Sequence, residues 1–440
     1  MGLGKTIQVL ALLDKRRTRR VPSGTDRKPS IAVVPKSLVG NWIEEAAKFT
    51  PKLRVFNYTG SDRKTRLTEA QAGRNAPHLL ITTYGTLRND ITDLLEQDFD
   101  FDYVILDEAQ AIKNPNSQAS KATRLLKGDH RLAMTGTPVE NHLGDLWALF
   151  DFLNPGMLKA GMTSRLPQLD DEEDRKRVEQ IGNSLRPFIL RRTKTQVLKD
   201  LPDKMEQTLS CDMSKPQRKL YDELREHYRV HLSKKVEELG LKRSKIHVLE
   251  ALLRLRQASC DPRLVKPDCD VRGAKIDLLL SQLAEIIENG HKALVFSQFT
   301  SLLSLLRNDI DARKWDYEYL DGKTRKRGEK VKRFQNQDDC QLFLISLKAG
   351  GTGLNLTAAQ YVFILDPWWN PAVEAQAIDR AHRIGQTNSV NAYRLICSDS
   401  VEEKIVELQQ NKRDLADAII SQDKSLISDL TSDDLQSLLG

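Results

Sequence analysis

The chain has 440 residues, more than a single hydrophobic core usually supports, and this length predicts two or three domains. Hydrophobic residues make up 40% and charged residues 29% of it, as in globular proteins, and no apolar run approaches the length of a membrane span. The formal net charge of +7 favours an anionic polymer as a partner, although only weakly for this length.

Cysteine usage and the first apolar run bear on the compartment. The five cysteines are scattered without a C-x-x-C pair, which favours reduced thiols over a zinc site or a disulfide framework. The apolar run IQVLALL is followed by the basic run DKRRTRR instead of a small-residue cleavage site, so we interpret it as part of a cytosolic protein and not as a signal peptide. The cysteines are Cys211, Cys260, Cys269, Cys340 and Cys397.

The chain opens on MGLGKT, which matches the end of a phosphate-binding loop. Gly2 and Gly4 would let the backbone approach a phosphate closely. Lys5 would neutralise the β- and γ-phosphates of ATP, and the Thr6 hydroxyl would hold Mg²⁺. The full pattern needs a further glycine one position before Met1 and a strand before that, so we expect a fragment, a misplaced start or the remainder of a longer protein.

Short apolar runs alternate with polar helical stretches over residues 31–140. IAVV, LLIT, YVIL and RLAMT are typical of strands buried on both faces, as in a parallel sheet covered by helices. Residues 292–396 repeat the pattern with KALVF, YEYL, QLFLIS, YVFIL and NAYRLI. The sequence therefore predicts an α/β fold with two lobes of similar size.

Two strands of the first lobe are expected to end on polar motifs. In FDYVILDEAQ a buried strand delivers Asp107, suited to the outer coordination of Mg²⁺, and Glu108, suited to polarising an attacking water. Adjacent acids are common in loops, but here they follow GLGKT in the same lobe. In LAMTGTPVEN the hydroxyls of Thr135 and Thr137 could hydrogen-bond these carboxylates, and an ordinary strand-to-helix turn is the alternative.

The composition changes over residues 156–272, which hold much charge and few strand-like runs. Ser214 and Gln217 form a capping-box start to a helix that carries an apolar stripe at Leu220, Leu224 and Tyr228. HVLEALLRLRQA is typical of a second, more apolar helix. We therefore expect lobes at residues 1–155 and 273–415, a helical insertion at 156–272 and a tail at 416–440.

The second lobe carries a helix with the pattern Q-x-x-x-R-x-x-R. Offsets of four and three place Gln376, Arg380 and Arg383 on one helix face, where two arginines could clamp a γ-phosphate. The alternative is a charged helix surface in which Glu374 and Asp379 are the ion-pair partners.

Two further segments of the second lobe have weaker signals. In LISLKAGGTGLNLT a strand ends at Ser346, and Gly350, Gly351 and Gly353 would allow close approach to a phosphodiester or to the nucleotide. The basic run of the second lobe is either a nucleic-acid contact or a solvated face. Its members are Lys323, Arg325, Lys326, Arg327, Lys330, Lys332 and Arg333.

In this order, the motifs resemble the SWI/SNF-type DNA-dependent ATPases of helicase superfamily two. The amino half contributes MGLGKTIQ, PKSLVGNW, ITTYGTL, DEAQAIKNP and TGTPVEN, and the carboxyl half PFILRRTK, DLPDK, SLKAGGTGLNLT, DPWWNPAVEAQAIDRAHRIGQT and EEKIVEL. The resemblance implies two RecA-like P-loop lobes with parallel sheets, ATP and Mg²⁺ between them, and family-specific helical protrusions in the insertion. The sequence lacks the upstream segment that cradles adenine in this family.

The resemblance also implies roles for individual residues. Asp107 and Glu108 would run hydrolysis with Arg380 and Arg383. The residues implied to bind the nucleotide and Mg²⁺ are Gly2, Gly4, Lys5, Thr6, Asp107, Gln376 and Gly353. The residues implied to contact DNA are Pro35, Lys36, Ser37, Thr82, Thr83, Ser346, Lys348, Gly350 and Gly351, and the basic run adds Arg325 and Arg327.

The leading interpretation is an ATP-dependent translocase on double-stranded DNA that contacts the backbone without sequence specificity and remodels or displaces DNA-bound protein. A truncated DNA-binding module with little or no ATPase activity is the alternative, and a strand-separating helicase or RNA-dependent ATPase is a third. We expect a monomer without a membrane partner, in the cytoplasm or nucleoid of a prokaryote, with the nucleus as the alternative.

Overall fold

The structure is a computed structural model, and the chain divides in it into two compact units, each taken by itself below. Unit 1 is built from Met1–Asp200 and unit 2 from Leu201–Ile420. The residues that the structure describes are 3–19, 27–72, 76–97, 99–136, 143–157, 184–190, 192, 194–198, 201–239, 241–350, 354–368 and 371–407.

Unit 1 is built on a parallel sheet with the strand order β2-β3-β1-β4-β5. β1, most of β3 and the second half of β4 are buried on both faces, because the side chains there are mostly aliphatic. The strands are β1 (Ser30–Val34), β2 (Val55–Asn57), β3 (Leu79–Thr83), β4 (Asp100–Asp107) and β5 (Lys127–Met134).

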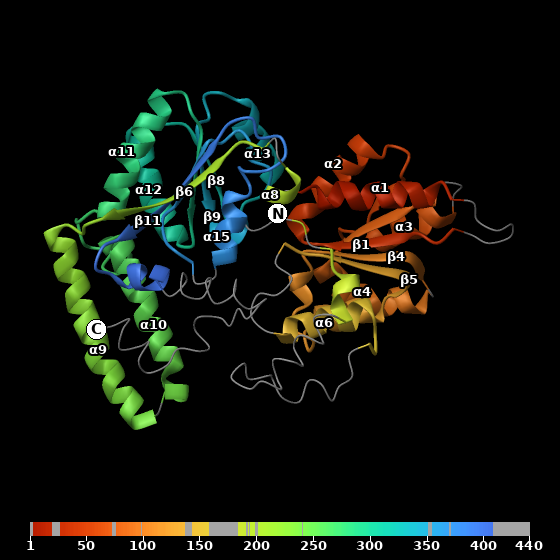
Figure 1. The fold of residues 1–440 in the computed structure, drawn as a ribbon, viewed down its shortest axis with the longest axis horizontal. Helices are drawn as coiled ribbons and strands as arrows, with labels where there is room; N and C mark the ends of the chain where they lie inside the picture. The colour runs from red at the N-terminus through yellow and green to blue at the C-terminus, as the bar shows by residue number, and fades with distance from the viewer. Residues whose placement is uncertain are drawn as a thin grey trace. The chain divides into compact units, whose positions relative to one another are not determined.

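Helices cover both faces of this sheet (Figure 1). Val9, Leu10 and Trp42 of α1 and α2 pack on one face, and Leu87 of α4 and Phe152 of α6 belong to the core on the other. The helices are α1 (Lys5–Arg17), α2 (Val39–Phe49), α3 (Arg63–Ala72), α4 (Tyr84–Glu96), α5 (Gln118–Leu125), α6 (Leu143–Leu153) and α8 (Lys194–Val197), with 3₁₀ turns η1 (Lys36–Leu38), η2 (Ala109–Ile112) and η4 (Arg186–Phe188).

Unit 2 contains a second parallel sheet, of order β6-β11-β10-β7-β9-β8. Three of its four inner strands, β7, β9 and β10, are almost fully buried, while the edge strand β6 is largely exposed. The strands are β6 (Lys204–Cys211), β7 (Ala293–Ser297), β8 (Tyr317–Leu320), β9 (Leu342–Ser346), β10 (Tyr361–Ile364) and β11 (Val390–Cys397).

The helices of unit 2 form two layers and a projecting hairpin. Leu283 of α11 and Leu303 of α12 pack on one face of the sheet, and Phe334 of α13 and Ile378 of α15 on the other. The long helices α9 and α10 form the hairpin (Figure 1). The helices are α9 (Lys215–Leu239), α10 (Leu241–Cys260), α11 (Ala274–Glu288), α12 (Thr300–Ala312), α13 (Arg327–Asn336), α14 (Leu347–Gly350) and α15 (Pro371–Ile378), with the 3₁₀ turn η5 (Pro262–Leu264).

The predicted α/β fold with two parallel sheets is confirmed, and every strand that the sequence predicts is present. Two strands were not predicted, the short β2 and the edge strand β6, all of which lies within the expected helical insertion. The capping box is half correct. The amide of Gln217 donates to Ser214 Oγ at 3.4 Å, but the Gln217 side chain donates to the carbonyls of Ala258 and Ser259. None of the helices described in the structure is both long and apolar enough to cross a membrane.

Candidate nucleotide site and nucleic-acid contacts

The parallel strands of unit 1 bring the predicted motifs of the amino half to one edge of the sheet. β4 ends at Asp107 beside Met134, the last residue of β5. β1 ends at Val34 beside Thr83, the last residue of β3. Since all these strands run in one direction, the residues that follow them share the carboxyl edge, where ligands bind in open α/β sheets.

The amino terminus of α1 has the backbone expected of a phosphate-binding turn. Gly4 is the N-cap residue and has a left-handed conformation (φ 67°), which a glycine adopts without strain. Gly4 accepts a hydrogen bond from the amide of Gln8 at 3.1 Å, and no side chain caps the first turn. The first-turn amides, next to Lys5 and Thr6, are therefore available to an anion. Gly2 lies outside the described residues.

Asp107 is held rigidly at the end of β4. Its side chain is 4% exposed, and it accepts hydrogen bonds from Trp42 Nε1 at 2.9 Å and from the amide of Glu108 at 3.0 Å. Its backbone carbonyl accepts from the Tyr84 hydroxyl at 2.8 Å. Burial raises the pKa of Asp107, and the bond from Trp42 and the charge of Lys5 partly oppose this shift. Lys5 therefore acts electrostatically on this carboxylate, as expected of groups in one site.

Glu108 has a backbone conformation that is rare for a residue with a side chain. Its φ of 48° is in the left-handed region, and such strain is found preferentially at functional sites. Its carboxylate accepts a hydrogen bond from Gln110 Nε2 at 2.8 Å, and Gln110 Oε1 accepts one from Thr135 Oγ1 at 2.9 Å. Thr135 therefore reaches the acidic motif through Gln110 and not by the direct bond that we predicted, while Thr137 lies outside the described residues.

The residues at this edge are compatible with a bound Mg²⁺. Among the described residues, no three His, Cys, Asp or Glu side chains are gathered as a metal cage. Mg²⁺ does not require one, because it keeps several waters and binds through one or two protein oxygens plus substrate phosphates. Thr6 and the Asp107 carboxylate are the two oxygen ligands that we expect for the ion.

The first set of predicted DNA contacts follows β1 and β3 at the same edge. Pro35 precedes the 3₁₀ turn that contains Lys36 and Ser37, and Lys36 and Ser37 are at least partly exposed. Thr83 caps α4 by accepting from the amide of Thr86 at 3.1 Å. Thr82, in contrast, is fully buried, and its hydroxyl donates to the carbonyl of Tyr58 at 3.1 Å, so this hydroxyl is not at the surface.

In unit 2, the helix with the Q-x-x-x-R-x-x-R pattern ends earlier than predicted. α15 ends at Ile378, and the chain continues in tighter turns in which the amide of Arg380 donates to Ala377 at 3.2 Å. The Arg380 carbonyl accepts from the amide of Leu356 at 3.0 Å, and this bond replaces an intrahelical one. The prediction that Gln376, Arg380 and Arg383 share one face of a continuous helix is therefore wrong. Gln376 and Arg380 are buried and Arg383 is partly buried.

The charged-surface alternative for this helix is also wrong for Glu374. This carboxylate is fully buried and accepts hydrogen bonds from the amide of Trp368 at 2.7 Å and from Arg394 Nε at 2.8 Å. Glu374 therefore links Trp368 to Arg394 of β11, and it is not an ion-pair partner of Arg380 or Arg383.

The structure describes the glycine-rich segment only in part. Ser346 is the buried last residue of β9, and Lys348 and Gly350 lie in α14 directly after it, in agreement with the predicted strand end. Gly351 and Gly353 lie outside the described residues.

The basic run of unit 2 separates into two groups of different environment. Arg325 and Lys323 are exposed, whereas Arg333 pairs with Asp316 and Glu318. Arg327 Nη2 donates to the carbonyl of Asp321 at 3.1 Å, so Arg327 holds the loop before α13 together. Of the two arginines predicted to contact DNA, Arg325 remains the better candidate. Arg327 has a structural role that the sequence did not reveal.

Two sequence families match the chain one after the other. The SNF2-related domain matches residues 1–264, and the helicase conserved C-terminal domain matches residues 274–385. MG018 of Mycoplasma genitalium, an ATP-dependent helicase by name, is 36% identical over 445 residues, which cover 100% of this chain and 41% of MG018. YwqA of Bacillus subtilis, named as an ATP-dependent helicase/translocase, is 36% identical over 452 residues, which cover 100% of this chain and 48% of YwqA.

Among solved structures, the Sulfolobus solfataricus SWI2/SNF2 ATPase core in complex with dsDNA is 33% identical. It matches with a TM-score of 0.46 over 100% of this chain and 91% of that one. The chain thus spans between 41% and 48% of the length of the two bacterial relatives.

Proposed function

Because the chain belongs to the SNF2-related family, we propose that it hydrolyses ATP to move along double-stranded DNA and so remodels or displaces DNA-bound protein. The observation that carries this proposal is the carboxyl edge of unit 1. There the uncapped start of α1 and the acidic pair Asp107 and Glu108 share an edge with Lys36 and Thr83. Because both proposed sites lie on one rigid sheet, a change at the nucleotide site can act directly on the DNA site.

In this proposal each residue of the nucleotide site has its own task. Lys5 and the first-turn amides of α1 bind the phosphates, while Thr6 and Asp107 hold Mg²⁺, which when bound neutralises phosphate charge. Glu108 orients and polarises the attacking water. Because Gln110 donates to Oε2 of Glu108, the other carboxylate oxygen remains for that water. Thr135 fixes the amide of Gln110 and so links the end of β5 to the hydrolytic carboxylate.

We further propose that unit 2 supplies Arg380, Arg383 and Gln376 to the nucleotide. Two guanidinium groups would stabilise the charge that develops on the transferred phosphoryl group. This role does not need the three residues on one helical face. A rigid turn after α15 would favour it, and the bond from the Leu356 amide to the Arg380 carbonyl supports such rigidity. Gly353 would approach the nucleotide from the same unit.

The DNA contacts proposed are directed at the phosphate backbone, so binding should be unspecific in sequence and steeply dependent on salt. In unit 1 they come from Pro35, Lys36, Ser37 and Thr83, and in unit 2 from Ser346, Lys348, Gly350, Gly351 and Arg325. Net movement requires that the DNA affinities of the two units change in opposite senses with the nucleotide state. The bacterial relatives favour a cytoplasmic or nucleoid location.

Displacement of a third strand from a DNA triplex tests translocation directly. We expect ATP-dependent release of the triplex-forming strand from a long duplex, no release with Lys5→Ala, and no separation of the duplex strands. Release that survives Lys5→Ala would show that this site does not drive movement. Separation of duplex strands would identify a helicase instead.

A further inference from the structure

Two cysteines face each other at the ends of neighbouring strands in unit 2. Cys211 is the last residue of β6 and Cys397 the last residue of β11, and the two are direct partners in the parallel register. Their sulfur atoms are 3.7 Å apart, and both thiols are free. Neighbouring strands are about 4.7–4.9 Å apart, and natural disulfides join Cα atoms about 4.4–6.8 Å apart. The backbone is therefore already at the separation that a disulfide requires.

The two thiols differ in exposure and in acidity. Cys211 is half-buried, and its hydrogen bond with Cys397 lowers its pKa, assisted by the positive charge of Lys275. Cys397 is fully buried, and its pKa is raised by the same hydrogen bond and by burial. A thiolate is the reactive form of cysteine, so an oxidant arriving from solvent reacts first at Cys211. Cys397 is then the thiol within reach of the oxidised sulfur.

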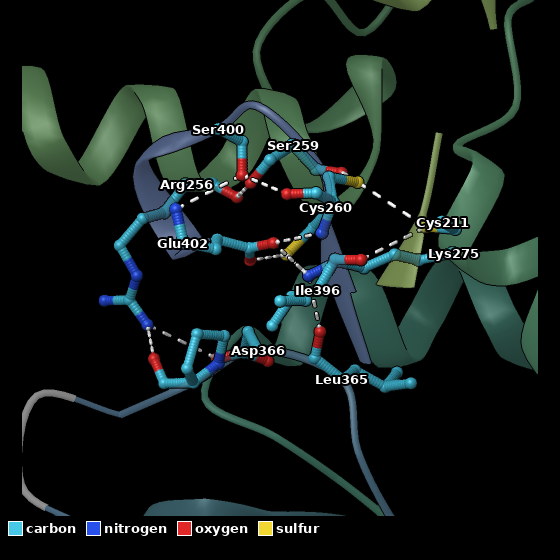
Figure 2. A network of polar contacts seen from close by, with 12 residues as sticks. Cys211, Arg256, Ser259, Cys260, Lys275, Leu365, Asp366, Ile396, Ser400 and Glu402 are labelled. Atoms are coloured by element: carbon cyan, nitrogen blue, oxygen red, sulfur yellow. Dashed lines mark hydrogen bonds and ion pairs between the residues drawn. The ribbon is translucent and has the colours of Figure 1, made fainter. Parts of the chain in front are cut away.

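A third thiol lies close by but cannot take part in the same way. Cys260, the last residue of α10, is fully buried, and burial raises its pKa well above the usual value. Its sulfur contacts Lys275 Nζ at 3.8 Å and Glu402 Oε1 at 3.5 Å (Figure 2). The Cys397 sulfur also lies 3.0 Å from the carbonyl oxygen of Ser259, next to Cys260. The reactive pair is therefore Cys211 and Cys397.

We propose that Cys211 and Cys397 are an oxidation site at which a peroxide joins β6 to β11 by a disulfide. The Cys211 thiolate attacks hydrogen peroxide, an S–O bond forms, the O–O bond breaks, and hydroxide leaves and takes up a proton. The Cys397 sulfur then attacks the resulting sulfenic acid, the S–S bond forms, the S–O bond breaks, and water leaves with the Cys397 proton. In sum, two thiols and one peroxide yield one disulfide and two waters.

The disulfide would attach the edge strand β6 covalently to β11, where the sheet meets the helical hairpin. Among the described strands, β6 pairs only with β11, and the Cys397 side chain belongs to the apolar core formed with α9, α10 and residues 401–407. The two cysteines are 186 residues apart in sequence, and a cross-link between distant residues restricts the unfolded chain strongly. The oxidised protein should therefore unfold at a higher temperature than the reduced protein.

The test is peroxide treatment of the full native chain, followed by alkylation of the remaining thiols and mass spectrometry. We expect the loss of two of the five thiols. We also expect a decrease of about 2 Da and a linked peptide pair containing Cys211 and Cys397, all reversed by dithiothreitol. Oxygen addition at Cys211 without a link, a link through another cysteine, or unchanged thiols would each overturn the proposal.

A matched variant and a stability measurement complete the test. Cys269 is also partly exposed in unit 2, so Cys269→Ser should leave the cross-link unchanged, whereas Cys211→Ser should abolish it. The unfolding midpoint of the wild type should rise on oxidation and fall back with dithiothreitol. An unchanged midpoint in a fully cross-linked sample would contradict the proposed role of the bond. These readouts do not depend on ATP turnover.

Discussion

Asp107 in unit 1 and Asp366 in unit 2 are comparable carboxylates in different surroundings. Asp107 is the last residue of β4, and Asp366 follows β10 by two residues. Both are almost completely buried, and burial raises the pKa of both, that of Asp366 to about 6. Position at the end of a parallel strand and burial therefore do not distinguish a reactive carboxylate from a structural one.

The neighbours of the two carboxylates do distinguish them. Asp366 accepts hydrogen bonds from the Ser297 hydroxyl and from the amide of Gln298. The Nη2 atom of the buried Arg256 guanidinium is 3.8 Å from its carboxylate (Figure 2). Asp107 instead precedes a strained acidic residue and lies in the electrostatic reach of Lys5. The first is a closed polar network that stabilises the fold, and the second has the groups that we propose act on a nucleotide.

The largest expected effect is on the acidic pair of unit 1, Asp107 and Glu108. Glu108→Gln should lower kcat for ATP hydrolysis by about 10²–10⁴-fold, because it removes the group that we propose polarises the attacking water. The midpoint of urea unfolding should remain near that of the wild type. Asp102→Asn, at the other end of the same strand and paired with Arg16, is the matched control and should retain kcat. An unchanged kcat for Glu108→Gln would contradict the role proposed for the acidic pair that follows β4.

The next effect concerns the buried ion pair of unit 2, which belongs to the same polar network as Asp366 (Figure 2). Lys275 and Glu402 are fully buried, and their charged atoms are 2.5 Å apart. Lys275→Met should destabilise unit 2 by about 3–5 kcal/mol, because it leaves a buried charge unpaired. The double variant Lys275→Met with Glu402→Leu should recover most of this loss. Urea unfolding followed by circular dichroism measures both, and a loss below about 1 kcal/mol would show that the network is not closed to water.

The next effect is the pH dependence of the unfolding free energy that arises from Asp366. In the folded state Asp366 holds its proton up to a pKa of about 6, whereas the ordinary value is 3.8. Between these values the unfolded state binds fewer protons, so the unfolding free energy should fall as the pH rises through this window, and stay lower above it. The decrease is at most about 3 kcal/mol, since each pKa unit corresponds to about 1.36 kcal/mol. Asp366→Asn should lack this component in urea titrations at pH 4–7, and an identical slope would contradict it.

A smaller effect tests the link from β5 to Glu108. Thr135→Val should lower kcat about fivefold with KM unchanged, because it removes one hydrogen bond of about 1 kcal/mol that orients Gln110. Thr123→Val, which removes a buried hydroxyl that donates to the Ser120 carbonyl, is the control and should leave kcat unchanged. Equal kcat values for the two variants would refute the link.

The smallest effect is expected at the surface of unit 2. Arg325→Ala should weaken binding to duplex DNA of any sequence and reduce the slope of log affinity against log salt by about 1. Arg333→Ala is the control, because this arginine is engaged with Asp316 and Glu318. Fluorescence anisotropy at several salt concentrations measures both slopes, and equal slopes would argue against a DNA contact at Arg325.

Much of the fold was predictable, because buried parallel strands are short aliphatic runs and the family resemblance, now confirmed, rests on long motifs. The edge strand β6 was missed because its side chains are largely exposed and KMEQTLSC lacks an aliphatic run. The end of α15 at Ile378 was missed because no glycine or proline lies between Ile378 and Gly385. A tertiary bond from Leu356 to the Arg380 carbonyl ends the helical pattern instead.

The position of the acidic pair at a strand end was predictable, and the contacts of the residues that support it were not. Asp107 and Glu108 were recognised at a strand end, since two adjacent acids are visible in a sequence. The contributions of Trp42, Gln110 and Arg327 depend on contacts with distant or backbone atoms, for which the sequence has no periodic signal.

Steady-state ATP hydrolysis by this chain, with Mg²⁺ and with duplex DNA, single-stranded DNA or no DNA, tests the central claim most directly. The account predicts turnover that duplex DNA stimulates strongly, single strands stimulate little, and Lys5→Ala abolishes. Intact duplex binding without any turnover would contradict it and identify the chain as a DNA-binding module.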